Sequence, residues 1–589
     1  MEKLVQFYTV EKDTLASELK EVKSKLANLS LLRLGVFLLT SAGIYFLFGN
    51  LINVAIISVV GIVVFWILLL KYLNKKEEKK LLQLKIQINL TEIKVQKGDY
   101  TSLKTGEEFI DGTHPFSNDI DLFGKGSFFQ FINRTATKEG ATELAKTLTE
   151  NEITSIPKKQ EALKELSKKV QWRQHFSALA GLVKTNHSST KIVDFIQKYT
   201  AVFSKSISKL PVVFSLISIV LIVMVSFEII PFSIFILWFF IGLAITAIFF
   251  MKTQHIYVNA GKAKETFKQY HLVLQEIENI KFTSEILQDK QQVIQSEKVI
   301  ASEIFKRFSK ILDAFDQRNN MLIAIVGNAL FLWDLRNAIK VERWIESYKH
   351  TVKKWFEVIA FFDAENSLAN FCFNHPTYTL PKIIKGKSII RGTQLGHPLL
   401  KSAKRIDNDF AILDKEFYII TGANMAGKST FLRTVSLSIV MSNIGLPVCA
   451  TSFQYSPIKL ITSMRTSDSL AEDESYFYSE LKRLKFIVDK IQTDDYFVIL
   501  DEILKGTNSK DKAIGSKKFV EKLLGSQSTG IIATHDVSLC ELENDFSEIK
   551  NYYFDAEINN DELFFDYLFK KGICKNMNAS FLLKKMKIV

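Results

Sequence analysis

Two long apolar blocks interrupt a chain whose other segments alternate polar and apolar positions. Residues 34–70 contain no charged side chain and are broken near Gly49, and residues 210–251 contain one charge, Glu228. The hydrocarbon core of a bilayer takes about 20 apolar residues per helix, so each block has room for two helices and a short turn. Pairs of buried core helices are the alternative, although such helices seldom run this far without a charge. The pattern predicts two transmembrane hairpins, over residues 31–71 and 210–251.

Basic residues flank both blocks on their outer sides. The flanking lysines are Lys71, Lys75, Lys76, Lys79 and Lys80 after the first block, Lys205 and Lys209 before the second, and Lys252 after it. Because the short turns carry no basic residue, both hairpins are expected to have their ends in the cytoplasm. This predicts a multi-pass protein of the inner (cell) membrane. A cleavable signal peptide is not expected, since the chain begins with a charged stretch.

Outside the two apolar blocks, the spacing of apolar residues changes once along the chain. Over residues 260–355 apolar side chains recur at steps of three and four, as at Ile300, Ile304 and Phe308, which predicts long, unbroken amphipathic helices. From Glu416 onward short β-rich runs alternate with helical segments, which is typical of an α/β domain.

Charge and cysteine content narrow the class of protein. The formal net charge of +13 favours nucleic acid or an anionic membrane surface, and the lysine flanks of membrane spans are the simpler source of it. The chain has four scattered cysteines and no CxxC pair, which favours reduced thiols and argues against a zinc site.

The stretch TGANMAGKST (421–430) follows an apolar run and opens a helical segment. Gly422 to Ser429 fit the pattern G-x-x-x-x-G-K-[ST] of a phosphate-binding loop. Glycines such as Gly427 let backbone N–H groups surround phosphate oxygens at the start of a helix. Lys428 is expected to reach the β- and γ-phosphates, and the Ser429 hydroxyl to bind Mg²⁺. The sequence therefore predicts ATP and Mg²⁺ as cofactors, with Thr430 at the edge of the loop.

Two further strand ends complete a predicted hydrolysis site. YFVILDE (496–502) ends in Asp501, expected to hold Mg²⁺ through water, and Glu502, expected to polarise the attacking water. GIIATHD (530–536) places His535 just past the next core strand, where it would contact the γ-phosphate. The alternatives are that Glu502 is merely an acid at the end of a strand and that His535 has a structural role. The phosphate-binding loop upstream favours catalytic roles for Lys428, Glu502 and His535.

The sequence around these motifs resembles one family. TGANMAGKSTFLR, LDEILKGTNSKD (500–511) and IIATHD closely resemble the ATPase domain of the MutS mismatch-repair family, and the pair Asn424-Met425 is more specific than the general loop pattern. Residues 121–148, with the turn T-x-T-x-x-G, and residues 361–371 and 395–400 resemble the family's helical core and the approach to its ATPase. The resemblance covers roughly residues 100–555, interrupted by the second apolar block.

The resemblance implies an ABC-type α/β P-loop ATPase domain, an all-α core or lever domain, and a homodimer with composite ATP sites. The residues expected in cis are Lys428, Ser429, Asp501, Glu502 and His535, with Gly422, Asn424, Met425, Gly427 and Thr430 in the loop. Ser475, within LAEDESYFYSEL (470–481), would approach the partner's γ-phosphate, although the glycine expected near Asp473 is missing. Gly506, Thr507 and Asn508 would line the dimer face.

Two departures from the family pattern lie close to the nucleotide. Arg405 stands near the place where the family stacks an aromatic residue on adenine, and an arginine can also stack there. Ala426 replaces a glycine and should fit only if its φ is negative.

The predicted organisation combines these parts. The expected segments are an N-terminal amphipathic helix (1–30), hairpin one (31–71), the first part of the core (72–209), hairpin two (210–251), long lever helices (252–375) and the ATPase domain (376–589). Neither the family's mismatch-reading module nor its β-rich DNA clamp is expected, because few residues precede the core and 260–355 is predicted to be helical throughout.

Three functions fit this organisation. The first is a membrane-anchored MutS-like ATPase that moves its helical core and acts on an unknown protein partner, with non-specific DNA contact through lysine-rich residues 71–85 as an addition. The second is a repair or recombination factor that binds mismatched or branched DNA. The third is an ABC-type transporter, which the absence of an LSGGQ signature and of polar residues in the hairpins disfavours.

Overall fold

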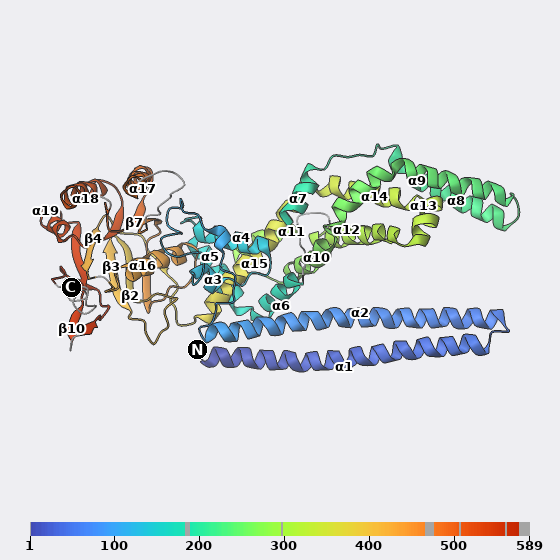
Figure 1. Ribbon diagram of the computed structural model, residues 1–589, viewed down its shortest axis with the longest axis horizontal. Helices are drawn as coiled ribbons and strands as arrows, with labels where there is room; N and C mark the ends of the chain where they lie inside the picture. Colours follow the sequence, from blue (N-terminus) through green and yellow to red (C-terminus); the bar gives the residue numbers. More distant parts are fainter. Residues whose placement is uncertain are drawn as a thin grey trace.

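The computed structural model describes residues 2–182, 189–295, 299–423, 425–465, 476–505, 508–559 and 562–575. Along its longest axis an α/β region lies at one end, a helical region in the middle, and two long helical hairpins point to the other end (Figure 1). Helix α1 (Glu2–Phe46) begins beside the helical region, whereas the last described residues, 562–575, belong to the α/β end.

The first hairpin consists of two very long helices, α1 (Glu2–Phe46) of 45 residues and α2 (Leu51–Gln96) of 46 residues. The chain reverses near Gly49, as expected, and the Asn50 side chain caps α2 by accepting the N–H groups of Ile52 and Asn53. At about 1.5 Å per residue each helix is roughly 70 Å long. The expected N-terminal helix and the first apolar helix are therefore one continuous element, and α2 continues from its apolar stretch into the expected core segment.

The second hairpin consists of α8 (Leu210–Ser226) and α9 (Phe232–Gly261), joined by a turn that contains Glu228, the one charged residue of the block. By length and composition, four helices among the described residues could cross a membrane: Glu2–Phe46, Leu51–Gln96, Ile207–Ser226 and Phe232–Gly261. In α1 and α2 no part of the most apolar window is buried, and in the other two the buried share is 17% and 6%. The turns of both hairpins lie at the same end of the molecule (Figure 1).

Shorter helices form the middle region. They are α3 (Phe128–Ile132), α4 (Lys138–Thr149), α5 (Ile156–Lys168), α6 (Val170–Gly181), α7 (Ser189–Lys198), α10 (Lys264–Asn279), α11 (Glu285–Gln295), α12 (Ala301–Asp316), α13 (Asn328–Phe331), α14 (Trp333–Tyr348) and α15 (Val352–Asn374). The prediction of unbroken helix over 260–355 is wrong, because this stretch is divided among several helices of at most 16 residues before α15 begins.

Contacts between distant residues explain these breaks. The carboxylate of Glu165 on α5 accepts the N–H groups of Thr283 and Ser284, which precede α11. The carboxylate of Glu278 in turn accepts the N–H group of Ser302 in the first turn of α12. Helix starts leave N–H groups without partners, so carboxylates from other elements fix where these helices begin.

Helix α15 is the centre of the helical region. Its buried Asp363 accepts the N–H groups of Ala136 and Thr137 at 3.0 and 2.8 Å and the Thr137 hydroxyl at 2.6 Å. A side chain at Gly140 would overlap the Asp363 carboxylate, which explains the glycine. The two upstream segments that resemble the MutS core, 121–148 and 361–371, are therefore in direct contact.

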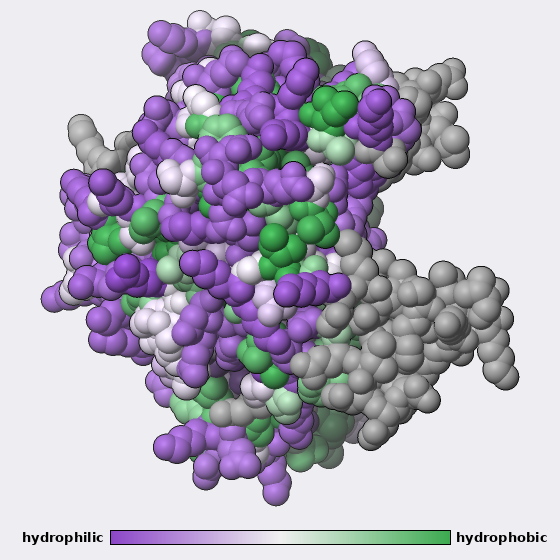
Figure 2. All heavy atoms as spheres, turned by 90° about the vertical axis from the view of Figure 1, so that its left-hand side faces the viewer, coloured by the Kyte–Doolittle hydropathy of each residue, from purple (hydrophilic) through white to green (hydrophobic). Residues whose placement is uncertain are grey.

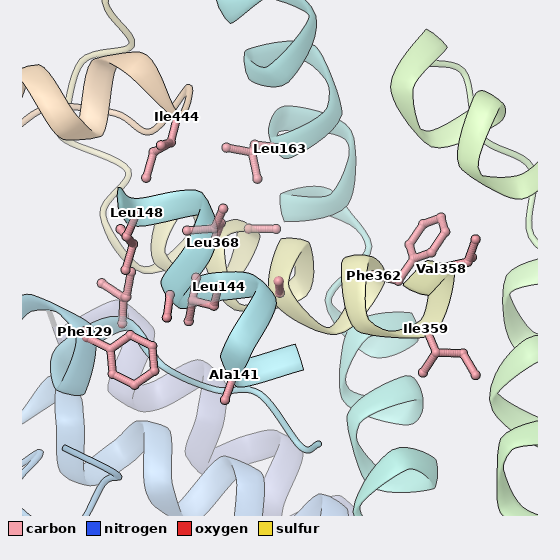
Figure 3. Packing of buried hydrophobic residues seen from close by; sticks show 14 of the residues in the cluster. Phe129, Ala141, Leu144, Leu148, Leu163, Val358, Ile359, Phe362, Leu368 and Ile444 are labelled. Atoms are coloured by element: carbon pink, nitrogen blue, oxygen red, sulfur yellow. The ribbon is translucent and has the colours of Figure 1, made fainter. Parts of the chain in front are cut away.

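Apolar packing extends from this contact into the α/β region. Figure 3 shows Leu144 of α4 beside Leu368 of α15, with Leu163 of α5 and Ile444 of the α/β region above them. All four side chains belong to one continuous buried cluster, so the helical and α/β regions share a core.

The α/β region is built on a six-stranded sheet in the order β12-β9-β4-β8-β7-β6. Its strands are β4 (Phe417–Gly422), β6 (Lys459–Ser463), β7 (Tyr496–Asp501), β8 (Thr529–Ala533), β9 (Ile549–Phe554) and β12 (Lys570–Lys571), all parallel except β12. The helices of this region are α16 (Lys428–Asn443), α17 (Tyr476–Ile491), α18 (Ser509–Leu524) and α19 (Leu542–Asp545). The expected α/β domain is thus present, and the carboxyl ends of its parallel strands share one edge.

A second sheet has the order β1-β5-β2-β3, with strands β1 (Lys382–Ile383), β2 (Ser388–Leu395), β3 (Asn408–Leu413) and β5 (Ser452–Tyr455). Strands β10 (Glu557–Asn559) and β11 (Glu562–Phe564) form a two-stranded ribbon. Figure 2 looks onto the α/β end of the molecule, where hydrophilic residues dominate the described surface and hydrophobic ones are scattered.

Edge strand β6 is tied to the helical region. Asn151 donates to the carbonyl oxygen of Leu460 at 3.0 Å and accepts the Leu460 N–H at 2.9 Å. Asp119 accepts the hydroxyl of Thr462 at 2.6 Å and the N–H of Arg465 at 2.9 Å. The sheet edge and the start of the helical region are therefore held in one register.

Candidate nucleotide-binding site

The loop between β4 and α16 carries the backbone geometry that its glycines predict. Gly427 has a φ of 106° at the start of α16, a conformation that residues with a side chain rarely adopt. At Gly422 an added Cβ would lie 2.6 Å from the carbonyl oxygen of Phe554. Among the described residues of this loop, positive φ falls on Met425 (70°) and on the two glycines and not on Ala426, so the alanine fits as expected.

Lys428 is buried at the first position of α16. Its ammonium group donates to the carbonyl oxygens of Gly422 at 2.6 Å and Ala423 at 3.0 Å, and lies 3.3 Å from Nε2 of His535. Burial lowers the pKa of Lys428, while the nearby carboxylates of Asp501 and Glu502 oppose this effect. The loop therefore surrounds the ammonium group of Lys428, and phosphate oxygens bound in the loop would contact that group.

The two predicted Mg²⁺ ligands are in contact. The hydroxyl of Ser429 donates to Oδ2 of Asp501 at 2.7 Å, which joins the start of α16 to the end of β7. A hydroxyl and a carboxylate are the hard oxygen ligands that Mg²⁺ prefers. The chemistry of this pair fits the cofactor that the sequence predicts.

Glu502 and His535 face each other beside the loop. The Glu502 carboxylate lies 3.5 Å from Nε2 of His535, and the Glu502 N–H donates to the carbonyl oxygen of Ala533 at 2.8 Å. Glu502 has a φ of 58°, so its backbone leaves the strand direction directly after Asp501. Burial, and next the charge of Lys428, lower the pKa of His535, which favours the neutral imidazole near pH 7.

These residues line one pocket of about 570 Å³. Its lining comprises Ala423, Met425, Gly427, Lys428, Ser429, Thr430, Asp501, Glu502, Lys505, His535 and Tyr567. The volume falls within the usual range for small-molecule and cofactor sites, about 300–1,000 Å³. The pocket therefore has the size and the polar groups that a nucleoside triphosphate with Mg²⁺ requires.

Sequence reasoning missed Tyr567 and Lys505. The Tyr567 ring lies close to Gly427, where an added Cβ would be 3.1 Å from it, and its carbonyl oxygen accepts a hydrogen bond from Asn408. No local motif marks a tyrosine so far along the chain from the loop. Arg405, the residue expected near adenine, is instead paired with Asp407 at 2.6 Å and is not part of the pocket lining.

Four predicted residues, Asn424, Ser475, Gly506 and Thr507, lie outside the described residues. The neighbouring Asn508 caps α18, where its side-chain oxygen accepts the N–H of Asp511 at 2.9 Å.

Comparison with known proteins shows which family the sequence of this site is similar to. The family described as MutS domain V matches residues 418–585. DNA mismatch repair protein MutS of Finegoldia magna is 30% identical over 295 residues, which are 49% of this chain and 33% of that protein. MutS protein homolog 4 of Homo sapiens is 26% identical over 246 residues, which are 40% of this chain and 26% of that protein. The matched region thus spans a quarter to a third of the length of these relatives.

The loop, the paired strand-end carboxylates and the parallel sheet define an ABC-type P-loop ATPase domain. More particularly, the C-terminal part of this chain is a MutS-family ATPase domain, and the chain is distantly related to MutS and to MutS protein homolog 4 over less than half of its length.

Proposed function

We propose that this protein is a membrane-anchored ATPase that hydrolyses ATP at MutS-type sites and uses it to move its helical core. One observation carries the proposal: an ATPase domain with a hydrophilic outer surface lies at one end of the molecule, and four exposed apolar helices end at the other (Figures 1 and 2). Apolar surface of this extent is unstable in water and stable in lipid.

The proposed roles at the site follow from its geometry. Lys428 and the loop N–H groups bind the β- and γ-phosphates, and Ser429 with Asp501 holds Mg²⁺, which neutralises phosphate charge when it is bound. Glu502 orients and polarises the attacking water. Neutral His535, within reach of both Glu502 and Lys428, contacts the γ-phosphate.

The family resemblance supports a homodimer joined through the ATPase domains. In that arrangement Ser475 of one protomer approaches the γ-phosphate bound by the other, and Gly506, Thr507 and Asn508 lie at the dimer face. Closure on ATP would then change the position of α15, because the ATPase and helical regions share one core.

A buried polar network supports transmission from α15 to the first hairpin. Glu92 of α2 pairs with Arg134 at 2.5 Å and accepts the side-chain amides of Asn370 at 3.1 Å and Asn374 at 2.9 Å, both on α15. Tyr8 of α1 donates to the same Asn374 at 2.7 Å. Because burial makes any unpaired member of such a network costly, movement of α15 would carry the base of the hairpin with it.

The boundary of the membrane in the first hairpin is marked by an arginine. The guanidinium of Arg33 on α1 lies 5.1 Å from the ring centre of Phe65 and 4.9 Å from that of Tyr72 on α2. Arginine and tyrosine at the end of an apolar stretch are typical of a membrane interface. The lysines that begin at Lys71 lie at the same end of the hairpin. Together these residues support a protein of the inner (cell) membrane whose core and ATPase domain are cytoplasmic.

A second candidate is a repair or recombination factor tethered to a membrane. The names of the relatives, which include DNA mismatch repair protein MutS, favour it. This chain is similar to a third or less of the length of these relatives, so the similarity does not show that it shares their whole activity.

Two measurements on the full chain test the proposal: the first tests the membrane anchor, which both candidates share, and the second separates the two functions. Alkaline carbonate should fail to extract the protein from membranes if the apolar helices are inserted; extraction would refute the membrane anchor. ATP turnover of detergent-purified protein should be nearly indifferent to homoduplex, mismatched and branched DNA. A several-fold change with one DNA structure alone would favour the repair function instead.

A further inference from the structure

We propose that Met321–Phe331, between α12 and α14, enters the membrane from the cytoplasmic side and returns to it, packed against the second hairpin. This inference rests on the proposed membrane insertion of α8 and α9. The segment reads MLIAIVGNALF and carries no charged side chain. At about 1.5 Å per residue the whole segment is roughly 16 Å long, about half of what is needed to span a bilayer core, so it cannot cross.

A glycine on α9 brings the backbones of the segment and the hairpin together. A Cβ at Gly242 would overlap the carbonyl group of Ala329 in α13, so only glycine permits this approach. On the α8 side, the Ser215 hydroxyl lies 3.5 Å from the carbonyl oxygen of Phe331. Figure 1 shows α13 lying along the two helices of the hairpin. The segment is therefore attached to the proposed membrane-spanning part and not to the soluble core alone.

The position of Gly242 gives the depth of the contact. It lies near the middle of the apolar stretch of α9, residues 232–251, about ten residues or roughly 15 Å from either end. In the proposed insertion of α9, the contact with Ala329 therefore lies inside the hydrocarbon core and not at its surface.

Apolar side chains of the segment are exposed in the isolated chain. The exposed fractions are 76% for Met321, 72% for Leu322, 41% for Ile325 and 42% for Val326. They continue the exposed apolar surface of α9, where Phe240 and Ile241, directly before Gly242, are 61% and 39% exposed. Lipid covering α9 at this depth would also cover the segment, which makes acyl chains the occupant that fits this surface.

The polar groups of the segment have partners within the protein, as lipid requires. The backbone is helical, with a π-helical turn at Ile323–Gly327 that continues into α13. Asn328 is buried; its side-chain amide donates to the carbonyl oxygen of Ala324 at 3.0 Å, and its side-chain oxygen accepts the N–H of Asp334 at 2.9 Å.

Both ends of the segment meet at the cytoplasmic end of α9. Arg318 before it and Asp334 after it form a buried ion pair at 3.1 Å. The Arg318 guanidinium lies 4.9 Å from the ring centre of Tyr257, and the Tyr257 hydroxyl accepts the Asn319 amide at 2.8 Å. Tyr257 lies just beyond the apolar stretch of α9, so the chain leaves and returns at one interface. Arg318 and Tyr257 repeat the arrangement of Arg33 and Tyr72 in the first hairpin.

Spin labels on the full chain in lipid nanodiscs test this depth. In a chain whose four native cysteines (Cys372, Cys449, Cys540 and Cys574) are replaced by alanine, single cysteines are introduced as Val326→Cys and Leu322→Cys in the segment, Phe240→Cys on α9, and Lys310→Cys on the exposed face of α12. Collision with O₂, which concentrates in lipid, is compared with collision with a water-soluble nickel chelate. ATP turnover of each labelled protein checks that it is folded.

Labels at Val326 and Phe240 should both favour O₂ strongly, whereas the label at Lys310 should favour the nickel chelate. If the Phe240 label lies in lipid and the labels at Val326 and Leu322 behave like Lys310, the re-entrant segment is refuted and the hairpin stands. Shielding of Val326 and Leu322 from both reagents would mean a protein cover, such as a second copy, and would also refute it. Nickel access at Phe240 would refute the membrane hairpin and this inference with it.

Discussion

The hydroxyl of Ser429 donates a hydrogen bond of 2.7 Å to the carboxylate of Asp501, two residues that are separated by 72 positions in the chain. The contact joins the phosphate loop to the end of β7 and sets two oxygen ligands side by side. Ser429→Ala removes one of them without changing the loop glycines. We expect ATP affinity in Mg²⁺ to fall about tenfold, with little change in EDTA, when titrated with a fluorescent ATP analogue. Equal losses in both conditions would contradict a role in Mg²⁺ binding.

Lys428 is the cation held inside the loop. Lys428→Ala removes a charge directed at the phosphates, and we expect ATP turnover to fall by on the order of 10²–10³-fold, as for loss of a preorganised electrostatic donor. Lys385→Ala is the matched control, since Lys385 is exposed in the turn before β2. Similar turnover for the two variants in a phosphate-release assay would refute the assignment of the site.

Tyr567 offers the one phenol ring in the described lining of the pocket, whose other aromatic side chain is the imidazole of His535. If the ring stacks on the base of the nucleotide, Tyr567→Ala should weaken ATP binding by about 1–3 kcal/mol, the usual value of one base stacked on an aromatic ring. Tyr567→Phe keeps the ring and should bind ATP nearly as the wild type does. Loss of binding in the phenylalanine variant would assign the effect to the hydroxyl instead, and calorimetry distinguishes the two results.

Asp363 makes the helical core sensitive to pH. Burial raises its pKa from 3.8 to about 6, although its hydrogen bonds to Thr137 and Ala136 oppose the shift. The folded state therefore holds this proton more tightly than the unfolded state, so the stability linked to it is present below about pH 4 and is lost as pH rises through 6. The loss is on the order of 3 kcal/mol. Asp363→Asn should lower the melting temperature overall and flatten its decline between pH 4 and 6. An unchanged slope would contradict the shifted pKa.

The sequence predicts the nucleotide site well because each part of it is local. A glycine pattern between a strand and a helix dictates the loop around Lys428, and an apolar strand dictates where Asp501 and Glu502 emerge. Tyr567 belongs to no such pattern. It lies in the pocket because the chain folds back toward the phosphate loop after β11. Its position depends on the tertiary fold, which local spacing does not encode.

The helical region shows the same limit. Apolar periodicity correctly indicates helices between residues 260 and 355 but not their ends. Those ends depend on carboxylates from other elements, such as Glu165 near α11 and Glu278 at α12. Likewise, Met321–Phe331 is too short to suggest a membrane segment until its contact with Gly242 is seen.

The central claim is that a MutS-type site hydrolyses ATP in a chain anchored by apolar hairpins. The most direct test is Mg²⁺-dependent ATP turnover by the full chain in lipid nanodiscs, wild type against Glu502→Gln, with ATP binding measured in parallel. Glu502→Gln keeps the shape of the side chain and removes its charge, so we predict that turnover falls by on the order of 10²-fold or more while ATP still binds. Equal turnover in the two proteins, or none in the wild type, would contradict the account.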